Sequence, residues 1–566
     1  MGNIINSCCI IKKCALFNQL YLNKGKITIN INKYFGQAFI LDKSNYGWSI
    51  LIFVSLALFI IGLDATFMNV AMTYLVKDLN TTLANIQSII AIYALVMGCF
   101  VLFGGKLQDV IGRKKTFLIG AIIYGVGSLI AAISTNALML LVGWSIIEGF
   151  GAALMLPATS SIITAHYTGS KRAFAMGFSS TLFIAATAIG PLLGGYLTTF
   201  YSWRWGFALE TILVVAILIL SYDIAESEIT LKWSDLNLRG AFLVSSGILL
   251  FIMGFLQLNN PATWVNHYGT IINPIGFAFA MSMILIGVLF ILIFFYYQRK
   301  LIKQGKKPFM DVRILKNRSF TFGNLSRLIL ALILAGLFYI IPVYVQTRWG
   351  VNALVTGLIL LPTSIGSAIF AISIGKLTKH IKAHYLVVMG FALSIIAILM
   401  LYHSFMYPAS LDMMDLIPGL FILGMGLGLA TPNITNIILS SVDDKQLGEA
   451  SGIHNTFINV GSSIGTVAIG LIFFIALYFN VAATLPVEYS VYQNQQALNH
   501  DIYSWVGKTL SPDMSTIMDD PKLFTLTFNS DSRGMQTAIL ASAILLFIGL
   551  ILSLFIKPPP DGKRKD

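Results

Sequence analysis

The sequence predicts an all-α integral membrane protein with fourteen transmembrane helices. Of its 566 residues, 57% are hydrophobic and only 11% are charged, whereas a soluble domain carries about 25% charged residues. Apolar runs of about 18 residues or more recur fourteen times, and each is long enough to cross a bilayer as a helix. Basic residues gather in alternate loops between these runs, which is typical of a multi-pass membrane protein.

The predicted spans follow one another along almost the whole chain. The first eight cover residues 48–75, 86–103, 117–133, 137–164, 173–200, 205–222, 238–258 and 271–297. The last six cover residues 320–345, 354–374, 385–402, 416–439, 451–479 and 535–556. An even number of spans places both termini on the same side of the membrane.

The distribution of basic residues predicts the orientation. If both termini are cytoplasmic, about 30 of the 37 Lys and Arg residues lie inside, in agreement with the positive-inside rule. We therefore expect a plasma-membrane protein with both termini in the cytoplasm. The net charge of +13 reflects this topology, so no nucleic-acid partner is expected.

The spans divide into groups of six, two and six. A basic stretch separates the first eight spans from the last six, and a long polar segment precedes the final span. The predicted parts are an N-terminal tail (1–47), an N-terminal six-helix bundle (48–225), two inserted helices (226–298), a basic cytoplasmic linker (299–319), a C-terminal six-helix bundle (320–557) with an exterior loop (480–534), and a C-terminal tail (558–566).

Residues 104–116 form a short basic loop between the second and third spans. Gly105 and Gly112 permit a chain reversal that a residue with a Cβ would resist, and Asp109 can pair with Arg113 or bind a helix N-terminus. The string G-x-L-x-D-x-x-G-R-K resembles the corresponding loop of the major facilitator superfamily, a family of secondary transporters. The resemblance implies the major facilitator fold. It also implies a role in conformational gating for Gly105, Asp109, Gly112, Arg113 and Lys114.

The fifth span contains the string G-P-x-x-G-G at residues 190–195. Proline removes a backbone donor and kinks a helix, while small residues let a neighbouring helix approach closely. The string resembles the signature of proton-driven exporters in this superfamily, and the six-two-six arrangement resembles its fourteen-helix drug:proton antiporter branch. A glycine-rich packing helix is the alternative interpretation. The residues concerned are Gly190, Pro191, Gly194 and Gly195.

Asp64 lies deep within the first span, in a run similar to the L-D-x-T-x-x-N-V-A run of the same branch. It is about 16 residues into the helix, hence roughly 24 Å from its cytoplasmic end. An ionisable side chain at this depth is costly and is a functional hypothesis by default. A carboxylate removed from water favours its protonated form, so Asp64 is predicted to exchange a proton for a cation. The alternative is a structural aspartate bonded to Thr66 or to a facing helix.

Two further carboxylates, Glu148 and Glu210, fall in the fourth and sixth predicted spans. The family usually has an arginine where this sequence has Ser145, and more often an asparagine at the position of Glu210. A proton relay built on that arginine cannot be carried over. We hypothesise that Glu148 and Glu210 replace it, which makes an anionic substrate less compatible with the cavity.

Several polar residues within spans are candidates for lining the cavity. Among them, His454 titrates in a range suited to proton exchange, although a helix-packing histidine is the simpler interpretation. These candidates are Thr66, Asn69, Arg327, Asn433, Asn436, His454 and Asn455, with Asn459 as a further possibility.

Together these features predict a proton-coupled exporter of amphipathic, cationic drugs or toxic compounds that works by alternating access. We expect a functional monomer in the lipid bilayer, with protons as coupling ion and no other cofactor or metal. A dedicated exporter of one metabolite, lipid precursor or siderophore is the alternative. A membrane-embedded transferase is disfavoured, because no interfacial loop clusters acid, base or metal-binding residues.

Overall fold

A computed structural model provides the structure of the protein. It describes residues 46–167, 169–222, 224, 226, 229, 232–259, 274–378, 380–407, 411–442, 446–484 and 521–556. Everything below concerns the compact unit that begins at Ile50. The predicted tails therefore lie almost entirely outside the described residues.

Every regular element in the described part of the chain is a helix. Those of the first half are α3 (Tyr46–Phe67), η3 (Met68–Val70), α4 (Met72–Asp78), α5 (Leu83–Ile111), α6 (Arg113–Ala132), α7 (Ala137–Leu140), η4 (Leu141–Glu148), α8 (Gly149–His166), α9 (Gly169–Phe200) and α10 (Arg204–Leu220). The remainder are η5 (Trp233–Asp235), α11 (Leu238–Asn259), α12 (Pro274–Lys303), η7 (Val312–Lys316), α13 (Arg318–Trp349), α14 (Ala353–Leu377), α15 (Ala383–Met406), η8 (Met413–Asp415), α16 (Leu416–Ser440), α17 (Leu447–Thr484) and α20 (Pro521–Leu554).

Within the described residues, thirteen helical stretches are long and apolar enough to cross a membrane. Fourteen were predicted, and the difference is α10. This helix occupies the position of the sixth predicted span but has only 17 residues. At 1.5 Å per residue it is about 26 Å long, slightly less than the roughly 30 Å of a bilayer's hydrocarbon core.

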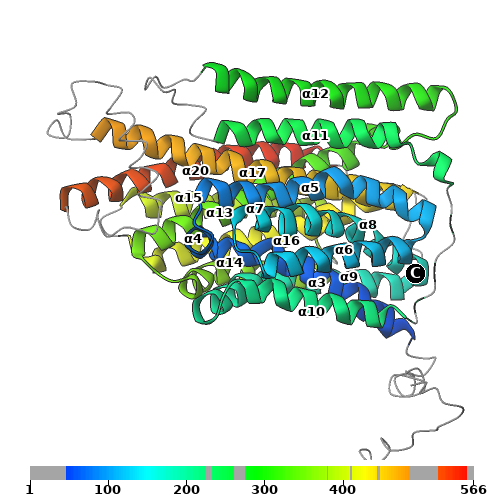
Figure 1. Ribbon diagram of the computed structural model, residues 1–566, viewed down its shortest axis with the longest axis horizontal. Helices are drawn as coiled ribbons and strands as arrows, with labels where there is room; N and C mark the ends of the chain where they lie inside the picture. The colour runs from blue at the N-terminus through cyan, green and yellow to red at the C-terminus, as the bar shows by residue number, and fades with distance from the viewer. Residues whose placement is uncertain are drawn as a thin grey trace, which may run out of the picture. The chain divides into compact units, whose positions relative to one another are not determined.

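The long helices run roughly parallel to one another (Figure 1), and they pack as two groups that meet along two seams. In the first group α6 packs on α8 and α10, and α5 packs on α8; in the second, α13 packs on α17, and α16 packs on α14 and α15. The seams between the groups are formed by α5 with α17 and by α9 with α14. Helix α11 packs on α5 and α17, and α12 runs alongside α11. The division into domains itself stays a prediction.

Glycines of the fifth predicted span make close helix contacts possible. A Cβ placed on Gly194 of α9 would lie 2.6 Å from the backbone oxygen of Phe67 in α3. One placed on Gly195 would lie 2.5 Å from the backbone oxygen of Ala353, where α14 begins. These glycines therefore bring α9 against helices of both groups, as small residues do in membrane proteins.

Two loops predicted from the sequence are largely helical. The segment 104–116 continues α5 as far as Ile111 and enters α6 at Arg113, so only Gly112 lies between the helices. Gly112 has φ +103°, a conformation that favours glycine, whereas Gly105 is an ordinary helical residue of α5. The prediction of a chain reversal at Gly105 was wrong because α5 continues past the predicted span 86–103 to Ile111.

The predicted exterior loop 480–534 is also shorter than expected. Helix α17 continues to Thr484 and α20 already begins at Pro521, so both ends of the predicted loop are helical. Residues 485–520 of this prediction lie outside the described residues.

Candidate functional site

Three acidic side chains from different helices meet in the interior of the first group. Asp64 comes from α3, Glu148 from η4 and Glu210 from α10, and one carboxylate oxygen of each lies within 4.8 Å of the others. All three side chains are buried, with exposures of 1%, 0% and 0% respectively. None of the ion pairs found among the described residues involves them. We call these three residues the acid cluster.

The element that carries Glu148 is a π-helical segment, η4, inserted between α7 and α8. Such segments widen the helical turn and recur at functional sites. Helix α6 approaches η4 closely at Gly127, where a Cβ would lie 2.5 Å from the backbone nitrogen of Glu148. This close approach brings Ser128 of α6 to Glu148, and its hydroxyl donates to Glu148 Oε2 at 2.9 Å.

Aromatic side chains enclose the cluster. Trp144 of η4 donates from its indole Nε1 to Asp64 Oδ1 at 2.9 Å. Its ring stacks on Tyr93 with 5.4 Å between centroids and meets Phe207 edge to face. The hydroxyls of Tyr93 and Tyr124 lie near the carboxylates without complete hydrogen-bond geometry. The cluster is therefore shielded by rings and has few donors.

Most carboxylate oxygens of the cluster lack a hydrogen-bond partner. These oxygens are Asp64 Oδ2, Glu148 Oε1 and both oxygens of Glu210. Buried polar atoms are nearly always paired in folded proteins, and an unpaired one requires an explanation. Carboxylates with free lone pairs at this spacing can share protons or accept a cation, organic or metallic. The expectation that no metal binds stays a prediction.

The other candidates in the first group are not part of the cluster. Thr66 donates to the backbone oxygen of Thr187 in α9, and Asn69 donates to the backbone oxygen of Ala65. Ser145, which stands where the family usually has arginine, donates to the backbone oxygen of Ile89 at 2.7 Å.

The candidates in the second group form a separate set. His454 lies between Asn324 Oδ1 (2.9 Å from Nδ1) and the Thr435 hydroxyl (3.1 Å from Nε2), so it links α17 to α13 and α16. The amides of Asn433, Asn455 and Asn459 each donate to a backbone oxygen four residues earlier, Asn436 is exposed, and Arg327 Nε is buried without a partner. None of the hydrogen bonds among the described residues connects these side chains to the acid cluster.

The start of α6 is bound by an acid that sequence reasoning missed. Glu226 follows the sixth predicted span, and its carboxylate accepts from the backbone nitrogens of Lys114 and Lys115, both at 2.9 Å. Asp109 lies in the last turn of α5, and its pairing with Arg113 or with a helix N-terminus stays a prediction. Arg113 donates to the backbone oxygen of Ser161 at 3.0 Å. A glutamate at a helix N-terminus is favourable because the unpaired backbone N–H groups carry partial positive charge.

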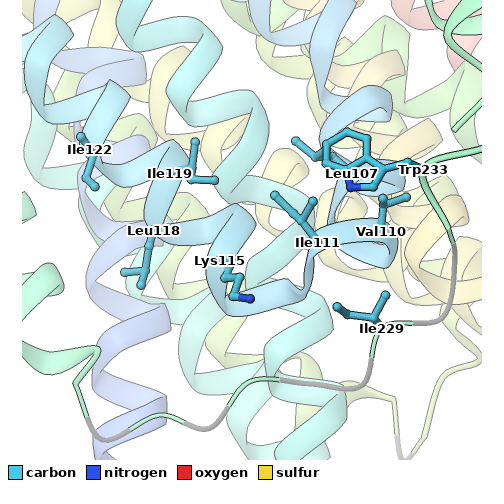
Figure 2. Close-up of a pocket in the computed structure, with 9 residues that line it drawn as sticks. All are labelled: Leu107, Val110, Ile111, Lys115, Leu118, Ile119, Ile122, Ile229 and Trp233. Carbon is cyan, nitrogen blue, oxygen red and sulfur yellow. The ribbon is translucent and has the colours of Figure 1, made fainter.

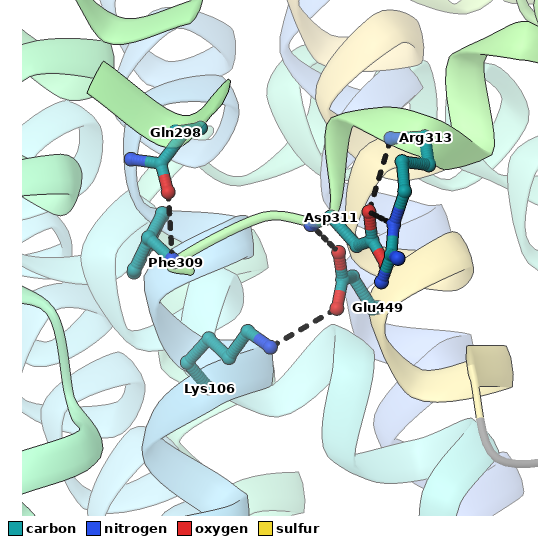
Figure 3. A network of polar contacts seen from close by, with 6 residues as sticks. All are labelled: Lys106, Gln298, Phe309, Asp311, Arg313 and Glu449. Carbon is teal, nitrogen blue, oxygen red and sulfur yellow. Dashed lines mark hydrogen bonds and ion pairs between the residues drawn. The ribbon is translucent and has the colours of Figure 1, made fainter. Parts of the chain in front are cut away.

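At the end of the helix bundle where α6 begins, a polar network joins the two groups (Figure 3). Lys106 of α5 forms an ion pair with Glu449 of α17, 3.0 Å between Nζ and Oε2. The other oxygen of Glu449 accepts from the backbone nitrogen of Asp311 in the basic linker. Asp311 in turn binds Arg313, 2.7 Å between Oδ2 and Nη2, and this neighbour lowers the pKa of Asp311. Lys106, Glu449 and Asp311, which we call the basic-end latch, thus connect both groups to the linker.

Hydrogen bonds also join the two groups at the opposite end of their interface. Gln346 of α13 donates to the backbone oxygen of Val70 at 2.8 Å, and its own side-chain oxygen accepts from Thr73 of α4. Polar contacts between the groups therefore exist at both ends of the helices.

The fold and the buried polar site define a multi-pass membrane transporter rather than an enzyme. The sequence profile of the Major Facilitator Superfamily matches residues 54–466, and the chain belongs to this family. The predicted resemblance is thus confirmed.

Several of the similar proteins are named for multidrug transport or drug resistance. The chain is 24% identical over 528 residues to the multidrug transporter protein MdtP of Bacillus subtilis, covering 90% of this chain and 93% of that protein. It is 25% identical over 424 residues to the probable multidrug resistance protein EmrY of Escherichia coli, covering 74% and 78%. A bacterial homolog of the human lysosomal transporter Spinster, solved in an inward-facing state, shares the fold with a TM-score of 0.55 at 14% identity, covering 92% of this chain and all of that one.

Proposed function

We propose that this transporter is a proton-coupled exporter of amphipathic, cationic drugs or toxic compounds in the plasma membrane. The observation that carries the proposal is the acid cluster, since three buried carboxylates without a basic partner suit a cationic ligand. The drug-resistance relatives support export. The proposal includes a functional monomer, cytoplasmic termini, and protons as the only coupling ion.

The electrostatics of the cluster explain why protons and a cation would compete. The carboxylate oxygens lie within 4.8 Å of one another, so at an effective dielectric constant of about 20 each pair of ionised carboxylates repels by at least about 3.5 kcal/mol. One bound proton removes two of the three repulsive pairs, and a bound monovalent cation offsets the repulsion in the same way. Occupancy by protons and occupancy by a cation are therefore alternatives.

This competition gives a transport cycle. A cation enters from the inside when the cluster has released protons, and the two helix groups rock to open the opposite end. Protons then bind from outside, displace the cation and allow the return. Each net charge that crosses is worth about 2.3 kcal/mol per 100 mV, so the number of protons exchanged decides whether voltage contributes to export.

The test is proton release from the purified full-length protein on addition of tetraphenylphosphonium, read with a pH dye in weak buffer. The wild type is compared with Asp64→Asn, Glu148→Gln and Glu210→Gln. The matched control is Asp531→Asn, because Asp531 is also a buried acid, here in α20, but lies outside the cluster.

We expect release in the wild type and in Asp531→Asn, and reduced or absent release in at least one cluster variant. Cation binding without any release would contradict proton coupling. Equal release in all variants would show that the protons come from elsewhere. Absence of binding by any lipophilic cation would favour the dedicated exporter of one metabolite.

A further inference from the structure

An open groove lies on the outer surface of the first helix group, at the same end as the basic-end latch (Figure 2). Its volume is about 700 Å³, within the range of roughly 300–1,000 Å³ that is common for small-molecule sites. Helix α5 contributes Leu107, α6 contributes Ile119 and Ile122, and the segment before α11 contributes Ile229 and Trp233. Apolar side chains from three segments of the chain thus line the groove.

The groove continues into a face of α6 that is directed away from the protein. Ile119, Ile122, Val126, Leu129 and Ile133 are 43–60% exposed. Their spacing of three and four residues places them on a single side of the helix. A long exposed apolar stripe on a transmembrane helix faces lipid chains. The groove therefore opens directly into the acyl region of the bilayer.

The other end of the groove carries a basic side chain. Among the described residues that line the groove, Lys115 is the only charged one. Its side chain is exposed, and no hydrogen bond or ion pair of its ammonium group is found among the described residues. By contrast, the Lys114 ammonium donates to the backbone oxygen of Ile224 at 2.6 Å.

Lys115, and not the helix end itself, is the group available to an anion. The N-terminus of α6 would normally attract a phosphate, but Glu226 already occupies the backbone nitrogens of Lys114 and Lys115. The ammonium of Lys115 is then the cation that remains at the mouth of the groove. A ligand that fits has a negatively charged head and an apolar tail.

We propose that this groove is a binding site for an anionic phospholipid. The phosphate binds Lys115, and an acyl chain lies along Ile119 and Ile122 toward the exposed stripe of α6. Trp233, which is 66% exposed, packs against the lipid at the level of the head groups, where tryptophan is commonly found. The site lies on the side predicted to be cytoplasmic, and the proposal does not depend on the transported substrate.

Fluorescence quenching by brominated lipids tests this directly. The full chain is reconstituted in phosphatidylcholine vesicles that contain either phosphatidylglycerol or phosphatidylcholine with brominated acyl chains. The difference in quenching between the wild type and Trp233→Phe isolates the signal of Trp233 from that of the other tryptophans. We expect brominated phosphatidylglycerol to quench Trp233 at a several-fold lower mole fraction than brominated phosphatidylcholine.

Two lysine variants identify the head-group contact. Lys115→Gln should abolish the preference for phosphatidylglycerol while leaving quenching by phosphatidylcholine unchanged. Lys303→Gln is the matched control, since Lys303 is an exposed lysine in the last turn of α12 and does not line the groove. Equal quenching of Trp233 by both lipids in the wild type would overturn the proposal. So would a preference that survives in Lys115→Gln, or a Trp233 that neither lipid quenches.

Discussion

The basic-end latch should control how often this end of the protein opens. We consider Lys106→Gln and Glu449→Gln, which remove one charge each and keep the side-chain length nearly the same. The pair is only 17% and 14% exposed, so it is less screened than a surface pair. The glutamine oxygen at position 449 can still accept from the backbone nitrogen of Asp311, so this change isolates the contribution of the charge.

The magnitude follows from the geometry. At 3.0 Å and a dielectric constant of about 20, the attraction is about 5.5 kcal/mol before desolvation. Desolvation offsets much of this, and the expected net value of about 1–2 kcal/mol lies between that of an exposed pair and that of a charged hydrogen bond. Loss of the pair should therefore raise the open population roughly five- to thirtyfold.

Thiol labelling of Gly448→Cys measures this opening in a background without the native cysteines. A Cβ at Gly448 of α17 would lie 3.6 Å from Gln108 of α5, so the position faces the seam and reacts when it opens. Labelling should accelerate five- to thirtyfold in either single variant. The control is Lys307→Gln. Lys307 forms an ion pair with Asp235 in which the two side chains are 60% and 24% exposed, and this pair does not join the two helix groups.

A double-mutant cycle decides whether the ion pair is responsible. If the two side chains act through each other, the double variant should label no faster than the single ones. Rates that multiply, or single variants that label like the wild type, would refute the reasoning.

Three further predictions concern the local structure. Gly127→Ala should lower the thermal unfolding midpoint and reduce the free energy of unfolding by about 1–3 kcal/mol, because its Cβ would lie 2.5 Å from the backbone nitrogen of Glu148. Gly177→Ala is the control and should be tolerated, because no neighbouring atom lies within 4 Å of its Cβ; equal unfolding midpoints for the two variants would contradict this prediction. Glu226→Ala should speed hydrogen exchange in the peptide containing Lys114 and Lys115 by removing the acceptor of both amides; unchanged exchange would mean that the carboxylate is not a cap in solution. Arg313 lowers the pKa of Asp311. The stabilisation from this carboxylate is therefore present above its ordinary pKa and is lost as the pH falls through the lowered value. At pH 5, the amide hydrogens of residues 312–316 should exchange more slowly in the wild type than in Arg313→Gln, and equal exchange rates would contradict the pairing.

The sequence was most informative where a structural feature depends only on the order of residues along the chain. A helix that crosses a bilayer needs a continuous apolar run, so the positions of the predicted spans agree with thirteen helices. Gly112 was predicted as a turn residue because only a residue without a Cβ adopts its conformation readily. Helix ends were less accurate, since α5 and α20 continue into polar sequence that no hydropathy criterion includes.

The sequence predicted the individual residues of the candidate site but not that they lie together. Asp64, Glu148 and Glu210 were singled out individually because an acid inside a membrane span is costly. Trp144 gave a weak signal, being four residues before Glu148 in the same helix. Ser128, Glu226 and Glu449 gave none, because each acts through a partner 20 to 343 residues away in the chain.

By itself, then, the sequence determined that this is a multi-pass transporter and which side chains carry charge inside it. Only the tertiary structure decided that three of these acids share one enclosed site, and that His454 and Arg327 do not belong to it. The reason is that hydropathy is a property of each segment in turn. The distance between two carboxylates, by contrast, depends on how close neighbouring helices come, and here that is decided by contacts such as the one that Gly127 makes with Glu148.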